Sequence, residues 1–359
     1  MTITFPRHDL KARGIRVALD LALGQLAIFE VFRDGRTISP FARVPWADQA
    51  YDTTRFPADM APHLRRMSGD FFCAPFCVDD VEGAPAHGWP ANAAWELITE
   101  MPFDGGITAK FRLTRLVAGA VVEKLWTLRD DHPFLYQEHR FSGGSGCIPM
   151  AHHTLLNLRN GGLLQFSPKL WAETPAQPLE KEHSVLRYPS KQTDITRFPG
   201  QNGPVDLTRY PIGTRHEDFV MLIDDPAQKL GWVTALRPTS GDITVMVKAV
   251  SALPQTMLWF SNGGRCAAPW NGEHVGVLGV EEACALAGEG WKASIAPNRL
   301  TGQGIATAID LGSSPAVSVS SVIGAFPCAA PNAQSLSISA FTIRLSNGNV
   351  VPFHSGHFD

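Results

Sequence analysis

The sequence predicts an all-β fold, on three observations. Roughly fifteen short segments with strand character recur about every ten residues along the 359-residue chain. Glycine and proline are frequent, at 32 and 27 residues, and both favour turns. No long amphipathic helix is evident. Such a pattern is typical of a β-sandwich or barrel. Because no Pro/Ser-rich or charge-rich linker divides the chain, we expect a single domain over residues 1–359.

The first strands are predicted from strict alternation of apolar residues. Ile15, Val17 and Leu19 share one parity, which indicates a strand over residues 15–23 with one buried face. Gly24 turns the chain into a second strand over 26–33, and the dipeptide at 34–35 is a hairpin signal. Residues 55–83 mix apolar residues with Gly and Pro, so we expect an ordered loop that faces a cavity.

The middle of the chain continues the pattern. We expect strands at 94–100, 107–116, 121–128 and 134–142, and a further segment packed into the core at 150–158. Residues 160–212 have little periodicity and are interpreted as short strands and long loops.

The last part of the chain again predicts strands, with one short helix over 281–288. The expected strands lie at 218–223, 230–236, 243–250, 257–260, 275–280, 305–309, 316–322 and 336–345. The strands at 316–322 and 336–345 are candidate sheet edges through which a homodimer would form.

Composition excludes several classes of partner. The net charge is −3 and no basic cluster is present, which argues against nucleic acid or an anionic membrane surface. The sequence contains no run of about 18 apolar residues, so no membrane-spanning helix is predicted. The N-terminus has no apolar segment of the kind found in secretory signals. Six cysteines without framework spacing are expected as free thiols in a cytoplasmic protein.

The first candidate for chemistry is His87, which precedes Gly88 between Pro85 and Pro90. A helix does not run smoothly through that sequence, so His87 is expected on a loop or strand edge. A histidine beside glycine can approach a small ligand closely.

Two pairs of adjacent residues supply the other candidates. His152 and His153 are neighbours, as are Glu281 and Glu282, and neighbouring strand residues point to opposite faces. At most one member of each pair is therefore expected in a given pocket. One histidine, a second histidine and a carboxylate form a general acid/base set. Adjacent strand histidines chelate one ion poorly, so no metal site is expected.

Further polar residues are candidates for binding. Arg65 or Arg66 would hydrogen-bond hydroxyl groups, as would Arg265 near Trp270, and Asp218 lies beside a strand. The sequence lacks a nucleophile elbow, a P-loop, a dinucleotide fingerprint and a His-Glu-x-x-His zinc motif. Covalent hydrolysis, NTP use and zinc proteolysis are therefore disfavoured.

Together these segments resemble the galactose mutarotase-like (aldose 1-epimerase) superfamily. That family has a His-Gly motif followed by a Trp-containing strand, similar to His87-Gly88 and Trp95. Its second histidine lies in a segment similar to residues 152–158, where it matches His153. Its late glutamate matches Glu281. The sequence departs from the family at Leu155, where an aromatic residue is usual, and it lacks the Asn-Arg motif before His-Gly.

The resemblance implies a β-super-sandwich and a mutarotase that interconverts sugar anomers without a cofactor. His153 would protonate the ring oxygen, Glu281 would take the anomeric proton, and His87 would hydrogen-bond the ring oxygen. A small carbohydrate would be the partner, bound by the residues Arg66, Asp218, Arg265 and Trp270. Two alternatives stay open: a non-catalytic carbohydrate-binding or regulatory protein, and another carbohydrate isomerase or lyase. Sequence also leaves open whether His152 or Glu282 takes its neighbour's role.

Overall fold

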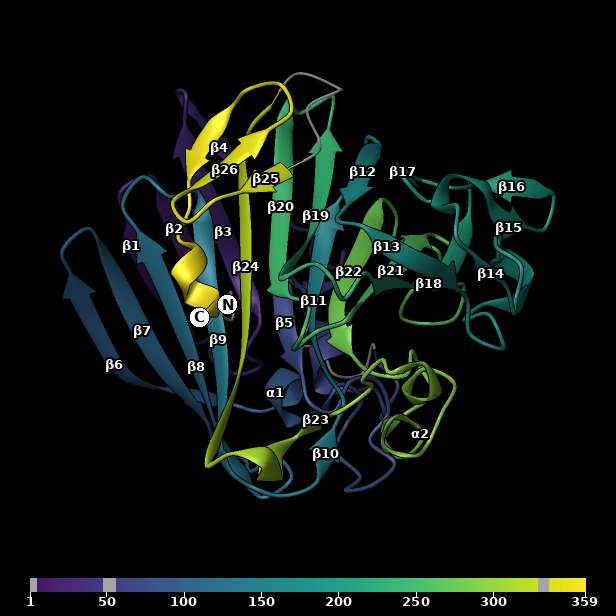
Figure 1. The fold of residues 1–359 in the computed structure, drawn as a ribbon, viewed down its shortest axis with the longest axis horizontal. Coiled ribbons are helices and arrows are strands. Elements are labelled where there is room, and N and C mark those ends of the chain that lie inside the picture. Colours follow the sequence, from purple (N-terminus) through teal and green to yellow (C-terminus); the bar gives the residue numbers. More distant parts are fainter. Residues whose placement is uncertain (1–4, 48–55, 329–335) are drawn as a thin grey trace.

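The computed structural model describes residues 5–47, 56–328 and 336–359, and it consists almost entirely of strands. Two large antiparallel sheets lie against each other, with smaller sheets at the periphery (Figure 1). The predicted all-β class, a β-super-sandwich, is confirmed. None of the helices in the described ranges is long and apolar enough to cross a membrane.

The sheet that carries the candidate site has seven strands. In spatial order these are β14 (Lys191–Gln192), β13 (Lys169–Glu173), β18 (His216–Asp224), β21 (Gln255–Asn262), β22 (Val277–Cys284), β11 (Met150–Asn157) and β5 (Asp70–Cys73). The strand expected at 275–280 continues as β22 through both glutamates. The predicted helix over 281–288 is therefore wrong: a buried ladder with β11 and β21 overrides local helix propensity.

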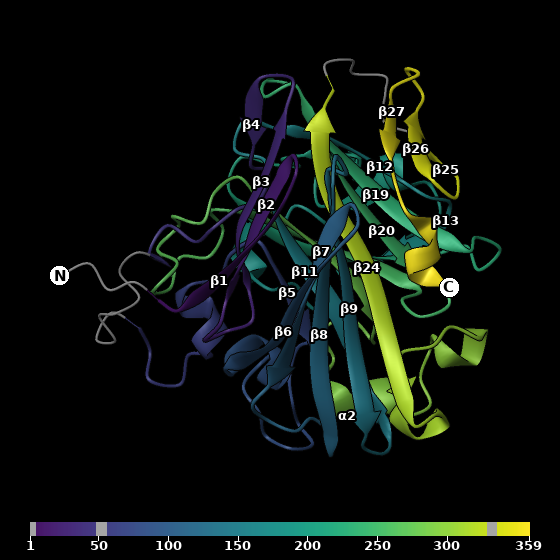
Figure 2. The same ribbon diagram turned by 90° about the vertical axis from the view of Figure 1, so that its left-hand side faces the viewer.

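The second large sheet has nine strands and faces the viewer in Figure 2. Its order is β17 (Arg209–Tyr210), β12 (Gly162–Phe166), β19 (Leu230–Arg237), β20 (Asp242–Ala249), β24 (Ala316–Pro327), β9 (Phe134–Gly143), β8 (Ala120–Arg129), β7 (Gly106–Leu113) and β6 (Trp95–Phe103). The segment 316–322, expected as a sheet edge, lies inside the sheet at its end: β24 pairs with β9 over residues 316–324 and with β20 over residues 321–327, which leaves residues 316–320 paired on the β9 side alone.

Shorter elements complete the fold. A four-stranded sheet contains β1 (Arg7–Ala12), β2 (Ile15–Asp20), β3 (Leu26–Arg33) and β4 (Arg36–Ile38). A three-stranded sheet contains β25 (Leu336–Ile338), β26 (Thr342–Leu345) and β27 (Val350–Pro352), so the segment 336–345 forms two strands instead of one. Two pairs are formed by β10 (Cys147–Ile148) with β23 (Ile309–Asp310), and by β15 (Phe198–Gly200) with β16 (Gly203–Val205). The α-helices are α1 (Gly88–Asn92) and α2 (Trp291–Ile295).

The largest apolar cluster fills the space between the two large sheets. From the seven-stranded sheet it takes Phe72, Leu156 and Val280, and from the nine-stranded sheet Phe111 and Trp126, all at most 1% exposed. Burying such side chains contributes about 1.5–3 kcal/mol each relative to exposure. This cluster fixes the inner face of the seven-stranded sheet.

A second apolar cluster covers the opposite face of the same sheet. It joins Phe71, Met221 and Trp259 on the strands to Trp46 and Leu300 from covering segments. Burial on both faces explains why β11, β18, β21 and β22 show no regular alternation of polar and apolar residues. The candidate site lies on this outer face, beneath the covering loops.

Candidate functional site

A cavity of about 350 Å³ opens on the outer face of the seven-stranded sheet. Its walls come from β11, β18, β21 and β22 and from loops between residues 63 and 87, 175 and 179, and 288 and 289. The lining residues are His63, Leu64, Met67, Phe76, Cys77, His87, His153, Pro175, Ala176, Gln177, Leu179, Phe219, Trp259, Arg265, Glu281, Gly288 and Glu289. Most are apolar, and four of the polar ones lie close together: His63, His87, His153 and Glu281.

The register of β11 and β22 brings two predicted residues together. His153 lies directly opposite Glu281 in the antiparallel ladder. Nε2 of His153 is 3.1 Å from Oε1 of Glu281, and each residue is 3% exposed. Nδ1 of His153 and Oε2 of Glu281 have no hydrogen-bond partner within the part of the chain that the structure describes. The two groups therefore touch each other at the cavity wall, and neither points into the core.

The neighbours of this pair face the other way, as strand alternation requires. His152 packs between the sheets, where its Nδ1 lies 3.8 Å from Asp70. Glu282 is buried beside Lys248 and accepts a hydrogen bond of 2.7 Å from Thr256. Neither His152 nor Glu282 lines the cavity. The register thus separates the two adjacent pairs that the sequence left unresolved.

His87 reaches the cavity from a tight turn before α1. Its φ is 67° and that of Gly88 is 71°, both in the left-handed region. At Gly88 a Cβ would lie 1.9 Å from the carbonyl oxygen of Ala74, so only glycine fits. Pro90 falls in the first turn of α1, where its missing N–H has no intrahelical partner to lose. The His87 ring lies 5.6 Å from that of His153.

A backbone contact sets the tautomer of His87. The N–H of Cys77 donates to Nδ1 of His87 at 3.3 Å, so Nδ1 is the acceptor and Nε2 carries the proton of the neutral ring. Burial, together with the neighbouring His63 and His153, holds the pKa of His87 well below its usual range. His87 therefore presents a neutral N–H donor rather than a cation.

Arg265 is the one Lys or Arg side chain among the described residues that line the cavity. Its Nε is 3.1 Å from Glu217, and its guanidinium lies 5.3 Å from the Trp259 ring and 4.7 Å from the Trp270 ring. Burial raises the pKa of Glu217 to about 7, and the Arg265 cation opposes that shift. Trp270 itself holds Arg265 and does not line the cavity.

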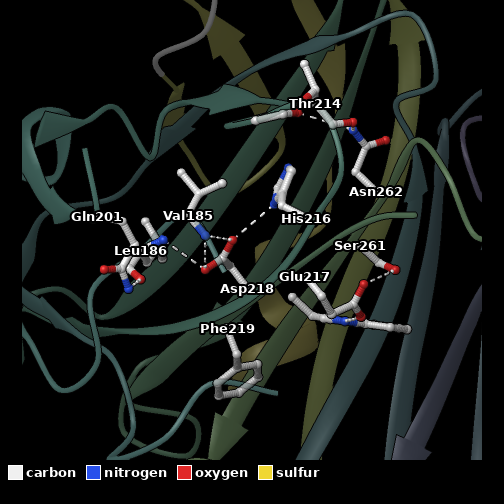
Figure 3. Close-up of polar contacts among 12 residues, drawn as sticks. Val185, Leu186, Gln201, Thr214, His216, Glu217, Asp218, Phe219, Ser261 and Asn262 are labelled. Carbon is white, nitrogen blue, oxygen red and sulfur yellow. Dashed lines mark hydrogen bonds and ion pairs between the residues drawn. The ribbon is translucent and has the colours of Figure 1, made fainter. Parts of the chain in front are cut away.

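Asp218 is not brought to the cavity, because it lies on the other face of β18 from Phe219. It accepts backbone hydrogen bonds from Val185 at 3.0 Å and Leu186 at 2.9 Å, and its Oδ2 is 3.1 Å from His216 (Figure 3). Its neighbour Glu217 reaches Ser261 on β21 (Figure 3). Asp218 therefore anchors the segment that contains Val185.

Arg66 also lies away from the cavity lining. Its Nη2 is 2.9 Å from Asp20, and its guanidinium stacks 3.4 Å from the Phe5 ring. These contacts link the loop to the N-terminal sheet. The prediction that Arg66 binds substrate finds no support in this placement, since Arg66 is not among the lining residues and its Nη2 pairs with Asp20.

Several lining residues were not identified from sequence, among them His63, Gln177, Phe219 and Glu289. His63 and Glu289 have residue types that signal chemistry, but no motif surrounds either one. Within the described residues, no group of three or more His, Cys, Asp or Glu is arranged to hold a metal ion.

The sequence and the fold were compared with those of known proteins. No protein-family model and no curated protein matches the sequence. Solved structures do match in fold. A candidate aldose 1-epimerase of Escherichia coli K12 has a TM-score of 0.58 and 12% identity, covering 90% of this chain and 99% of that one. A candidate mutarotase of Salmonella typhimurium has a TM-score of 0.54 and 12% identity, covering 89% and 90%.

A third match is the Slr1438 protein of Synechocystis sp. PCC 6803, with a TM-score of 0.53 and 14% identity, covering 91% of this chain and 98% of that one. Identities this low establish the fold and leave the activity open. The sheet order and these matches agree with the resemblance inferred from residues 87, 153 and 281: the chain has the galactose mutarotase-like fold.

Proposed function

We propose that this protein is an aldose 1-epimerase that interconverts the α and β anomers of a sugar. The observation that carries the proposal is the contact of His153 and Glu281 at the wall of a cavity that His87 also lines. A basic and an acidic side chain at 3.1 Å can hold one proton between them, as a general acid and a general base require.

The side-by-side placement suits the hemiacetal. The ring oxygen and the anomeric oxygen are bonded to the same carbon, so adjacent groups reach one oxygen each. His153 in its protonated form gives a proton to the ring oxygen while Glu281 takes the proton of the anomeric hydroxyl. The bond between C1 and the ring oxygen breaks and an open-chain aldehyde forms.

Ring closure reverses these transfers. The aldehyde rotates about the C1–C2 bond, and the hydroxyl on C5 attacks its other face. His153 recovers its proton from that hydroxyl, and Glu281 returns its proton to the carbonyl oxygen. The neutral His87 donates from Nε2 to the ring oxygen during both steps. Each positioned proton transfer contributes about 10²–10⁴-fold, and no cofactor enters this sequence of steps.

The residues around His153 and Glu281 favour this acid/base role. The His153 ring stacks 4.6 Å from Phe71, which fixes its orientation. Trp259 and Phe219 supply apolar surface beside the pair, as sugar rings prefer. Withdrawal from water also strengthens electrostatic interactions between the pair and a bound ring.

The test is anomer exchange followed by NMR or polarimetry over aldoses, uronates and hexose 6-phosphates. We expect acceleration with one class of sugar, and a loss of at least about 100-fold in Glu281→Gln and in His153→Ala. Glu96→Gln, at an exposed position on β6, is the matched control and keeps full activity.

Two outcomes would contradict the proposal. Acceleration that survives both substitutions removes the assigned roles. Sugar binding without acceleration by the wild type identifies a carbohydrate-binding protein instead, with the same residues serving recognition.

A further inference from the structure

A third histidine, His63, lines the same cavity and has no role in the steps above. It lies in a 3₁₀ turn over Pro62–Arg65 and is 1% exposed. Its ring centroid is 5.1 Å from that of His87. Three imidazole rings thus follow one another along the wall, in the order His153, His87 and His63.

Hydrogen bonds determine which nitrogen of His63 carries the proton. The side-chain amide of Asn92 donates to the carbonyls of Ala86 at 2.8 Å and Gly88 at 2.7 Å, which fixes the position of its oxygen. That oxygen accepts from the backbone N–H of His63 and lies 3.0 Å from its Nδ1. An amide oxygen only accepts, so Nδ1 is protonated and Nε2 bears the lone pair.

Among the described residues, Nε2 of His63 has no hydrogen-bond partner. Burial lowers the pKa of His63 to about 4, so the ring stays neutral at physiological pH. A buried acceptor without a donor is unfavourable, and a hydrogen-bond donor on a ligand would remove that cost. Orphaned atoms of His153 and Glu281 belong to the same cavity, which marks it as a site for a ligand rich in hydroxyl groups.

The order of the histidines indicates which hydroxyl meets His63. With the anomeric oxygen at Glu281 and the ring oxygen between His153 and His87, the next atom around the ring is C5. Its exocyclic substituent then lies toward His63. This placement rests on the proposed function, which sets the anomeric carbon at Glu281.

We propose that Nε2 of His63 accepts a hydrogen bond from the exocyclic hydroxymethyl group of an uncharged aldohexose and makes the site selective for it. A 6-deoxy sugar leaves the acceptor unpaired. A uronate or a 6-phosphate presents anionic acceptors to the lone pair of His63. Arg265, the one Lys or Arg among the described lining residues, is already paired with Glu217.

The experiment measures equilibrium binding, so it does not depend on turnover. Dissociation constants are determined for D-glucose, 6-deoxy-D-glucose, D-glucuronate and D-glucose 6-phosphate, and for the corresponding galactose series. We expect the wild type to prefer the hexose over its 6-deoxy analogue and over the uronate by about tenfold. His63→Phe retains the ring and the backbone N–H to Asn92, and it should reduce the preference over the 6-deoxy sugar to about twofold or less.

Nitrogen-15 NMR of the wild type gives a second readout that needs no variant. Nε2 of His63 should show an unprotonated resonance that shifts with hexose and not with the 6-deoxy sugar. An unchanged preference in His63→Phe, a protonated Nε2, or a preference for the anionic sugars would each overturn the inference.

Binding and exchange also separate the two proposals. Selective hexose binding without accelerated exchange contradicts the epimerase and supports the role of His63. Accelerated exchange with no dependence on the hydroxymethyl group contradicts only the role of His63. Failure to bind any of these sugars contradicts both.

Discussion

At the scale of single residues, Gly88 near the cavity leaves no room for any larger side chain. It follows His87 in the left-handed region and approaches Ala74 so closely that a Cβ would overlap the backbone. The position of His87 therefore depends on the absence of a side chain at Gly88.

We expect Gly88→Ala to reduce the free energy of unfolding by about 3 kcal/mol or more, because it adds steric overlap to an unfavourable φ. Gly83→Ala is the matched control: its φ is +76° and no atom lies within 4 Å of the added Cβ. That control should cost only about 1 kcal/mol. Urea unfolding measures both, and equal losses would show that the contact with Ala74 is unimportant.

Residue motifs located part of the candidate site. His87 beside glycine, His153 and Glu281 were each named from short patterns, and all three line one cavity. His63 could not be found this way, because its relation to His87 depends on Asn92 and on the turn between them. Contacts of that kind have no local signal in sequence.

At the scale of elements, strand register decides what single residues do. In β18, Glu217 and Asp218 point to opposite faces, and both faces are buried. Because polar and apolar residues do not alternate in this strand, the sequence does not indicate which of Glu217 and Asp218 faces the cavity. The same limit left His152 and Glu282 open until the ladder of β11 with β22 was known.

Asp218 is predicted to stabilise the loop segment that it anchors. Asp218→Ala would leave the N–H groups of Val185 and Leu186 without their acceptor. We expect a loss of about 3 kcal/mol in unfolding free energy. Faster amide hydrogen exchange should appear first at residues 185 and 186.

The control for this change is Glu182→Ala, at an exposed position in the same segment. It should alter stability by less than about 0.5 kcal/mol. If Asp218→Ala leaves both stability and exchange rates at residues 185 and 186 unchanged, the anchoring role is wrong.

At the scale of the whole molecule, buried histidines couple stability to pH. Burial lowers the pKa of His63 to about 4 and that of His274 to about 3, and it holds the pKa of His139 well below its usual range. Below pH 6.5 the unfolded chain binds protons that the folded chain does not. These groups therefore make the free energy of unfolding decrease as the pH is lowered. Glu217, whose pKa is raised to about 7, acts in the opposite direction between pH 7 and 4.5.

The strand pattern predicted the overall architecture because it depends on turns and apolar runs that repeat along the chain. The strand pattern does not predict which ionisable side chains are buried. His139 and Phe72 lie 67 positions apart in sequence, yet their rings stack at 3.9 Å between the two sheets. The packing of the sheets places this imidazole where neither nitrogen has a hydrogen-bond partner among residues 5–47, 56–328 and 336–359.

His139→Phe tests this coupling directly, since phenylalanine keeps the stacked ring and removes the proton site. From pH 6 to pH 5 we expect the variant to lose about 1 kcal/mol less unfolding free energy than the wild type, because one buried histidine contributes up to about 1.4 kcal/mol per pH unit in this window. Urea unfolding at half-unit pH intervals measures both slopes. Above pH 7 imidazole is neutral in both states, so the two profiles should run parallel there. Profiles that stay parallel down to pH 5 would show that His139 is protonated as readily in the folded chain as in the unfolded one.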